Sequence, residues 1–140
     1  MEIAHKIEPP LILLLFNIYK ITNKMPIEKT ISFPQLQMDV EYVVGKNANE
    51  NFELIDDAED YHIWFHVKGH SSSHVIAKLE DDLKKKDLRY IIKQGAILCK
   101  QYSKLSSSKN VEIIYTQIKN ITKTDIPGSV CTQNEKTITI

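Results

Sequence analysis

The chain has 140 residues, a length that suits one domain, and 42% of them are hydrophobic, which is enough for a core. Its 18 basic and 18 acidic residues cancel, so net charge alone indicates no class of partner. The two cysteines, Cys99 and Cys131, lack metal-binding spacing, which excludes a zinc knuckle or a disulfide framework and predicts reduced thiols in a cytoplasmic protein.

Charge is distributed unevenly along the chain. Residues 25–82 contain four lysines and twelve acidic residues, whereas residues 83–124 contain ten basic and two acidic residues. A split of this kind predicts a polyanionic partner for the second half. The alternative is a protein-interaction adaptor that docks a protein partner through the acidic first half.

The N-terminal segment contains one apolar run, Leu11 to Ile21, which is shorter than the roughly 20 residues of a membrane-spanning helix. No membrane span is expected. A signal peptide is the alternative, since Lys6 precedes the run, but no small-residue cleavage site follows. We expect residues 1–24 to be a peripheral extension, with Met25 as an alternative start, and residues 25–140 to form the domain.

Three strands are predicted in the first half of the domain. Val40 to Val44 precedes a cluster of turn-forming residues at 45–49. His62 to Val67 alternates apolar and other residues with period two, which is typical of a strand. His74 to Leu79 repeats this alternation after a glycine and three serines, and the two runs are predicted to pair as a hairpin with a long loop.

A long helix is predicted over residues 87–105, where apolar residues recur at spacings of three and four. Its opposite side is expected to present one exposed line of basic residues, namely Arg89, Lys93, Lys100 and Lys104. Strands are predicted at residues 111–116, 118–121 and 137–140. This order predicts an α+β fold in which the helix packs across a mainly antiparallel sheet.

Motifs for catalysis or cofactor binding are weak in this sequence. Histidines 62, 66, 70 and 74 are four residues apart, but the residues between them favour strands and turns over the helix that a metal stripe needs. Ser73 beside His74 is no nucleophile elbow, and neither glycine-rich phosphate motif occurs. We expect no catalytic residue, no metal and no cofactor; a histidine-dependent metal hydrolase remains an alternative.

Lysines and aromatic residues suit a phosphodiester chain, because lysines neutralise phosphates and an exposed aromatic ring can stack on a base. Trp64 has the structural alternative of a core residue. Likewise, Lys84 to Lys86 has the alternative of a solvated loop.

A series of motifs runs in order along the domain. It begins with Val44 to Asn51 with a G-K-x-x-x-x-N turn, the strand Ile63 to Val67 containing WFHV, and Ser73-His74-Val75. Tyr102-Ser103-Lys104, Val111 to Thr116, Lys119 to Lys123, Pro127-Gly128 and Lys136-Thr137-Ile138 follow. Together these motifs resemble the NFACT-R family, from about residue 38 to the C-terminus, and are most similar to its standalone members. Ser71-Ser72-Ser73-His74 departs from the family's common PGSH.

The resemblance implies an α+β RNA-binding domain that, in larger relatives, works with tRNA and the large ribosomal subunit in ribosome-associated quality control. The expected partner is rRNA, tRNA or a ribosomal particle. The resemblance assigns RNA binding to eight candidates: Lys46, Asn47, Asn51, Trp64, His66, His74, Lys119 and Lys123. Charge adds Arg89, Lys93, Lys100 and Lys104, and phosphate positioning is expected to outweigh base recognition.

Overall fold

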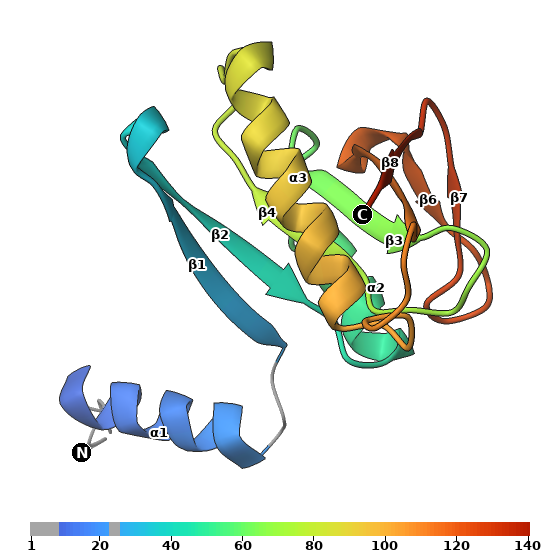
Figure 1. The fold of residues 1–140 in the computed structure, drawn as a ribbon. Coiled ribbons are helices and arrows are strands. Elements are labelled where there is room, and N and C mark those ends of the chain that lie inside the picture. The colour runs from blue at the N-terminus through green and yellow to red at the C-terminus, as the bar shows by residue number, and fades with distance from the viewer. Residues whose placement is uncertain (1–8, 23–25) are drawn as a thin grey trace, which may run out of the picture.

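A six-stranded antiparallel sheet, in the order β1-β2-β4-β3-β5-β8, forms the centre of the protein (Figure 1). The computed structural model describes residues 9–22 and 26–140. The six strands are β1 (Ile27–Phe33), β2 (Met38–Val44), β3 (Ile63–Val67), β4 (Val75–Lys78), β5 (Glu112–Gln117) and β8 (Lys136–Thr139). A 3₁₀ turn, η1 (Pro34–Leu36), joins β1 to β2. The predicted α+β class with a mainly antiparallel sheet is confirmed.

One long helix, α3 (Lys85–Gln101), packs on one face of the sheet, as Figure 1 shows. It buries Ile91, Ala96 and Cys99 completely, so the predicted apolar stripe does form the packing face. The helix begins two residues earlier and ends four residues earlier than predicted. Lys104 therefore lies beyond the helix, in the turn that follows it.

The predicted hairpin of β3 and β4 lies in the middle of the sheet, where Phe65 pairs with Val75. Because side chains alternate along a strand, Phe65 and Val67 belong to the core under α3. Trp64 belongs to a second core on the opposite face. Both faces of the central strands are therefore buried, and the only exposed residue within β3 and β4 is Lys78.

The opposite face is covered by α2 (Ala48–Asp56) and by a two-stranded sheet of β6 (Ile121–Lys123) and β7 (Val130–Thr132). The strand predicted at 118–121 is wrong, because residues Ile118–Asn120 form a 3₁₀ turn, η2, and the strand begins only at Ile121. This turn buries Ile118 in the second core beside Trp64. Strands β1 and β7 and helix α2 were not predicted from the sequence.

Helix α1 (Pro9–Thr22) contains the apolar run of the N-terminal segment and lies apart from the sheet in Figure 1. Six of its side chains, Leu11 to Leu15 and Ile18, are each 45–60% exposed. Among the described residues, no helix has both the length and the apolar character needed to cross a membrane. Lys6 and Met25, on which the alternatives for this segment depend, lie outside the described residues.

Gly95 allows α3 to approach the sheet closely. A Cβ atom at this position would lie 2.3 Å from Cζ of Phe65, whose ring is itself fully buried. Such a separation is far below van der Waals contact, so the ring or the helix would have to move. A larger residue at position 95 therefore disrupts the main core.

We predict that Gly95→Ala lowers the free energy of unfolding by about 1–3 kcal/mol, because overpacking outweighs the better helix propensity of alanine. Urea denaturation followed by circular dichroism measures this change. Lys93→Ala, at an exposed position of the same helix, is the control and should change stability by only a few tenths of a kcal/mol. A Gly95→Ala variant as stable as the wild type would contradict the close packing.

Candidate functional site

A pocket of about 640 Å³ lies on the α2 face, where β2 and β3 end and β4 begins. We call it the first pocket. It brings together residues from six segments of the sequence. Those used below are Lys46, Asn47, Asn51, Trp64, His66, Ser71, Ser72, Ser73, His74, Lys104, Ile114, Gly128 and Ser129.

His74 is the buried centre of this pocket, with 1% of its side chain exposed. Trp64 Nε1 donates a hydrogen bond to His74 Nδ1 at 3.0 Å, and the backbone of Gly128 lies near the imidazole. Because an indole nitrogen only donates, Nδ1 is the unprotonated nitrogen and Nε2 holds the proton. The protein therefore fixes both the orientation and the tautomer of this histidine.

Burial determines the charge of His74. Desolvation, with the neighbouring ring of His66 adding to it, lowers the pKa of His74 to about 3. Burial also lowers the pKa of His66, whose ring lies 5.2 Å from that of His74 and stacks parallel to the indole of Trp64 at 5.6 Å. Both histidines are therefore neutral at physiological pH and serve as flat polar groups.

Trp64 is not an exposed surface for stacking a base, because only 2% of its side chain is accessible. Trp64 is instead a core residue, which was the structural alternative for this position. Its indole supports the site instead, holding His74 through a hydrogen bond and His66 through ring stacking. His66, which is half-buried, is the ring of this cluster that the pocket can present.

Asn51 connects helix α2 to the same cluster. Its Oδ1 accepts a hydrogen bond from the His74 backbone N–H at 3.2 Å, and Gly45 N donates to the His74 carbonyl at 3.0 Å. A Cβ atom on residue 45 would lie 2.1 Å from Asn51 Oδ1, so only glycine permits this approach. The predicted G-K-x-x-x-x-N turn thus places an amide against the start of β4.

The start of α2 forms one wall of the pocket. Asn47 Oδ1 caps the helix by accepting from Glu50 N at 2.9 Å, and the Glu50 carboxylate accepts from Lys46 N and from Asn47 Nδ2. This arrangement is a variant of the capping box, in which Glu50 reaches the backbone N–H of the residue before the N-cap. The side chain of Asn47 is consequently used to cap the helix. Lys46 is the residue before it and lines the pocket.

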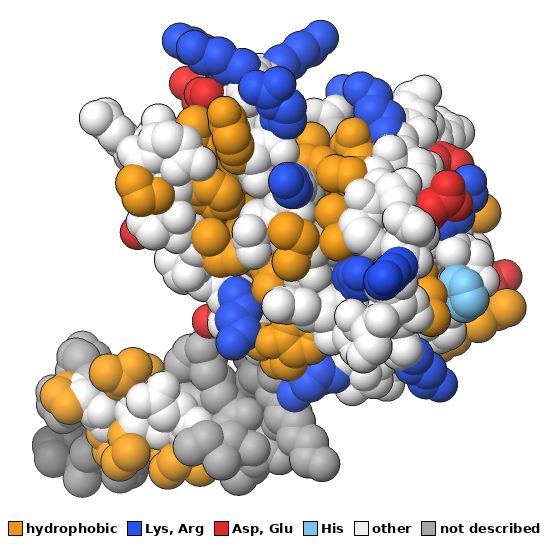
Figure 2. Space-filling model, viewed as in Figure 1, with side chains coloured by type: hydrophobic (Ala, Val, Ile, Leu, Met, Phe, Trp, Pro, Cys, Tyr) orange, Lys and Arg blue, Asp and Glu red, His pale blue; other side chains and the backbone are white. Residues whose placement is uncertain are grey.

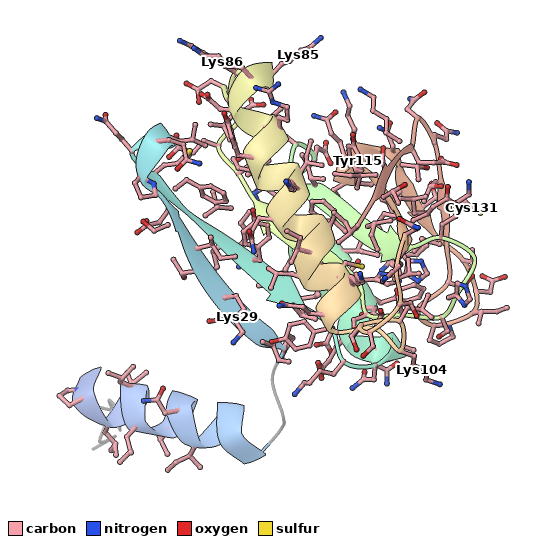
Figure 3. All side chains as sticks on the ribbon, in the orientation of Figure 1. Lys29, Lys85, Lys86, Lys104, Tyr115 and Cys131 are labelled. Carbon is pink, nitrogen blue, oxygen red and sulfur yellow. The ribbon has the colours of Figure 1, made fainter. Side chains whose placement is uncertain are left out.

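Charge in the first pocket is entirely positive. Among the described residues that line it, Lys46 and Lys104 have charged side chains and no acidic residue is present. Lys104 comes from the turn that follows the C-terminal end of α3 (Figure 3). Hydroxyl groups of Ser71, Ser73 and Ser129 also line the pocket and add hydrogen-bonding capacity.

The remaining predicted basic residues do not gather at this pocket. Lys100 is half-buried and donates to the Ile140 carbonyl at 3.3 Å, and Lys123 pairs with Asp56 while lying over the Phe52 ring. Arg89 and Lys93 are exposed on α3, and Lys119 lines a different groove. The expected single line of positive charge is wrong, and Figure 2 shows lysine and arginine side chains at several separate places over the α3 face.

The side chains of His62, His66, His70 and His74 do not form one cluster. His66 and His74 contact each other, whereas His62 accepts from Glu59 N through Nδ1 and His70 lies in an exposed turn. Within residues 9–22 and 26–140, no three histidine, cysteine or acidic side chains are grouped so that they could hold a metal ion. The first pocket is therefore a polar recess with two lysines and not a set of metal ligands.

Sequence reasoning missed the loop Pro127 to Val130 and the segment Tyr102 to Ser103 as walls of the pocket. Pro127-Gly128 and Tyr102-Ser103 belong to the motif series of the sequence, and residues 71–73 belong to the predicted hairpin loop. Their composition predicts turns, but nothing local indicates that these turns meet over His74.

Comparisons with known proteins bear on this site. A model of the family described as the NFACT protein RNA binding domain matches residues 31–135, which include every residue of the first pocket. No curated protein matches the sequence.

Among solved structures, the chain is similar to the C-terminal part of the fibronectin/fibrinogen-binding protein from Streptococcus suis, with 23% identity and a TM-score of 0.69. The match covers 99% of this chain and 47% of that one, so the chain spans about half the length of that structure. At this identity the similarity shows a shared fold.

The low pKa of His74 predicts an acid-sensitive fold. In the unfolded chain this histidine binds a proton below about pH 6.5, whereas in the folded state it does so only near pH 3. Stability is therefore complete above pH 6.5 and is lost as the pH falls, by about 1.4 kcal/mol per pH unit for this group.

Replacing His74 by Gln should flatten the dependence of unfolding free energy on pH between about 6 and 4, measured by urea denaturation at each pH. Gln removes the titrating group and keeps a polar side chain of similar length. His70→Gln, in the exposed turn, is the control and should keep the wild-type slope. Equal slopes in all three proteins would show that His74 is not buried in its neutral form.

Proposed function

Because the chain belongs to the NFACT RNA-binding domain family, we propose that it binds RNA through the first pocket and catalyses no reaction. The observation that supports this most is that most residues assigned by the family resemblance lie around one pocket. Of the eight candidates that the resemblance assigned, six line one pocket, namely Lys46, Asn47, Asn51, Trp64, His66 and His74. They come from three segments of the chain, so their meeting is a property of the fold.

The chemistry of the pocket suits a phosphodiester chain. Lys46 and Lys104 line it and would neutralise phosphates, while serine hydroxyls of the same pocket can donate to phosphate or ribose oxygens. The half-buried ring of His66 offers a flat neutral surface beside these groups. A volume of about 640 Å³ is within the range of pockets that enclose a small molecule the size of a nucleotide.

Several contacts support a binding role over a catalytic one. Nδ1 of His74 accepts from the Trp64 indole, so this nitrogen is not available to take a proton from a substrate. The Ser72 hydroxyl accepts from the Val67 backbone N–H and donates to the Ser73 carbonyl. This serine is therefore held by backbone groups and not by a base.

We further propose that the RNA is rRNA or tRNA and that the protein works in the cytoplasm with ribosomal particles, in ribosome-associated quality control. The support is the ordered motif series that resembles this family. Crosslinking in cells followed by sequencing of the attached RNA tests the proposal. Recovery of mRNA or DNA without rRNA or tRNA would contradict this narrower role. RNA binding by the domain itself is tested by the next experiment.

The double variant Lys46→Gln/Lys104→Gln should weaken binding to a fluorescent 12-nucleotide oligouridine and reduce the salt dependence of binding. Each phosphate contact on a single strand contributes about 0.7 to the slope of log K against log salt, so the loss of two contacts lowers the slope by about 1.4. Fluorescence anisotropy at several salt concentrations measures both quantities.

The charge-matched control is Lys29→Gln/Lys78→Gln. Lys29 is exposed on β1 and Lys78 pairs with Glu41 at 3.6 Å, and neither lines the first pocket. This control should keep the wild-type slope. An equal loss in both double variants would indicate a general charge effect, and the absence of wild-type binding at low salt would defeat the proposed function.

The adaptor alternative predicts a partner that survives nuclease treatment. Exposed acidic residues of α2 and the turn after it, Glu53, Asp56 and Asp57, would form the docking surface. Capture of the same protein partner from treated and untreated extract, with loss of capture when these residues are neutralised, would favour the adaptor over the RNA-binding role.

A further inference from the structure

A second groove, of about 500 Å³, lies on the opposite face of the sheet from the first pocket, between α3 and the strands β5 and β8. We call it the lateral groove and use six of its residues: Lys85, Leu88, Ile92, Tyr115, Lys119 and Lys136. Two neighbouring residues of β5 show how the two sites are related. Ile114 lines the first pocket and Tyr115 lines the lateral groove, and adjacent side chains of a strand point to opposite faces.

Tyr115 forms an aromatic floor for this groove. It pairs with Lys136 of β8, so the two side chains leave the sheet on the same face, and Figure 3 shows Tyr115 beside α3. The Tyr115 ring is half-buried and packs against the fully buried ring of Phe65 at 6.2 Å. Its position is therefore determined by the core, and Leu88 and Ile92 of α3 add an apolar wall.

Three lysines surround this floor. Lys85 comes from the first turn of α3, Lys119 from η2 and Lys136 from β8, and no acidic residue lines the groove. Among residues 9–22 and 26–140, none of the three forms an ion pair, in contrast to Lys68, Lys78 and Lys123. The acidic residue next to Lys136 is directed elsewhere, since the Glu135 carboxylate accepts from the Thr132 hydroxyl.

Three unpaired cations around an aromatic and apolar floor suit a ligand that has both an anionic group and a flat ring. A nucleotide has this composition, with phosphate for the lysines and a base for the tyrosine. An acidic peptide would satisfy the lysines but would leave the aromatic floor without a stacking partner. The amide side chains of Gln117 and Asn134 at the same groove could bind base edges or ribose.

We propose that the lateral groove is a second RNA-binding site that accepts one nucleotide, with its phosphate at Lys119 and Lys136 and its base against Tyr115. This inference rests on the proposed RNA-binding function and extends it to the other face of the sheet. A strand that occupies both sites passes around the turn between β7 and β8, which contains Asn134 at a positive φ of 53°.

The experiment uses the full chain and the 12-nucleotide oligouridine with 4-thiouridine at alternating positions. Light-induced crosslinks are mapped by mass spectrometry, and affinity and salt slope are measured by anisotropy. We expect a crosslink at or next to Tyr115, and a Lys119→Gln/Lys136→Gln variant with a salt slope lowered by about 1.4. Tyr115→Leu should lower affinity roughly 5-fold or more, as expected for the loss of one stacked base.

Controls separate this site from the first pocket and from loss of folding. Lys29→Gln/Lys78→Gln removes the same charge elsewhere, and Tyr90→Leu removes an aromatic ring that is 44% exposed on α3 and outside the groove. Thermal unfolding identifies any variant that is destabilised. If Tyr115→Leu is one of these, the lysine variant and the wild-type crosslink decide the question.

Each outcome has a definite meaning. Loss of affinity only in Lys46→Gln/Lys104→Gln, with no crosslink near Tyr115, overturns the lateral site and leaves the proposed function standing. No wild-type binding overturns both. A hexaglutamate peptide tests the groove for protein docking. The proposal is also overturned if this peptide displaces the RNA, binds the wild type more tightly than the RNA does, and fails to bind Lys119→Gln/Lys136→Gln.

Discussion

The hydrogen bond from Trp64 to His74 is the interaction on which the organisation of the first pocket depends. It joins β3 to the start of β4, and the backbone of the loop at Gly128 lies near the imidazole of His74. The His74 backbone N–H in turn donates to Asn51 Oδ1 of α2. One buried histidine thus links two strands and a helix and lies beside a loop, and a buried polar group of this kind stabilises the fold only when each of its partners is present.

This dependence explains why the residues with the strongest family resemblance are so deeply buried. Trp64, Asn51 and His74 are each less than 10% exposed, so they shape the recess more than they contact a ligand. In the proposed function, direct contacts with RNA are made chiefly by Lys46 and Lys104. A recess of buried polar groups with cationic side chains among its lining is suited to holding a backbone of phosphates with little discrimination between bases.

The fold also separates the positive charges into groups with different surroundings. Lys123 and Lys100 are committed to partners within the protein, whereas the lysines of the lateral groove are not. Equal numbers of acidic and basic residues therefore coexist with local recesses that contain only cations. For a polyanion, the local charge matters more than the total, because salt screens charges that are farther apart than about 10 Å.

The sequence by itself determined the fold class, the hairpin of β3 and β4, and the apolar stripe of α3, because period-two and period-3.6 patterns are local properties of the chain. It did not reveal α2, although Asn47 and Glu50 have capping-box spacing, since that helix has only nine residues and few apolar ones. Only the tertiary structure decided which lysines share a recess. Tyr115 lies beside Lys136, and Lys46 shares the first pocket with Lys104, through strand register and loop closure, which join residues more than 20 positions apart and leave no local pattern.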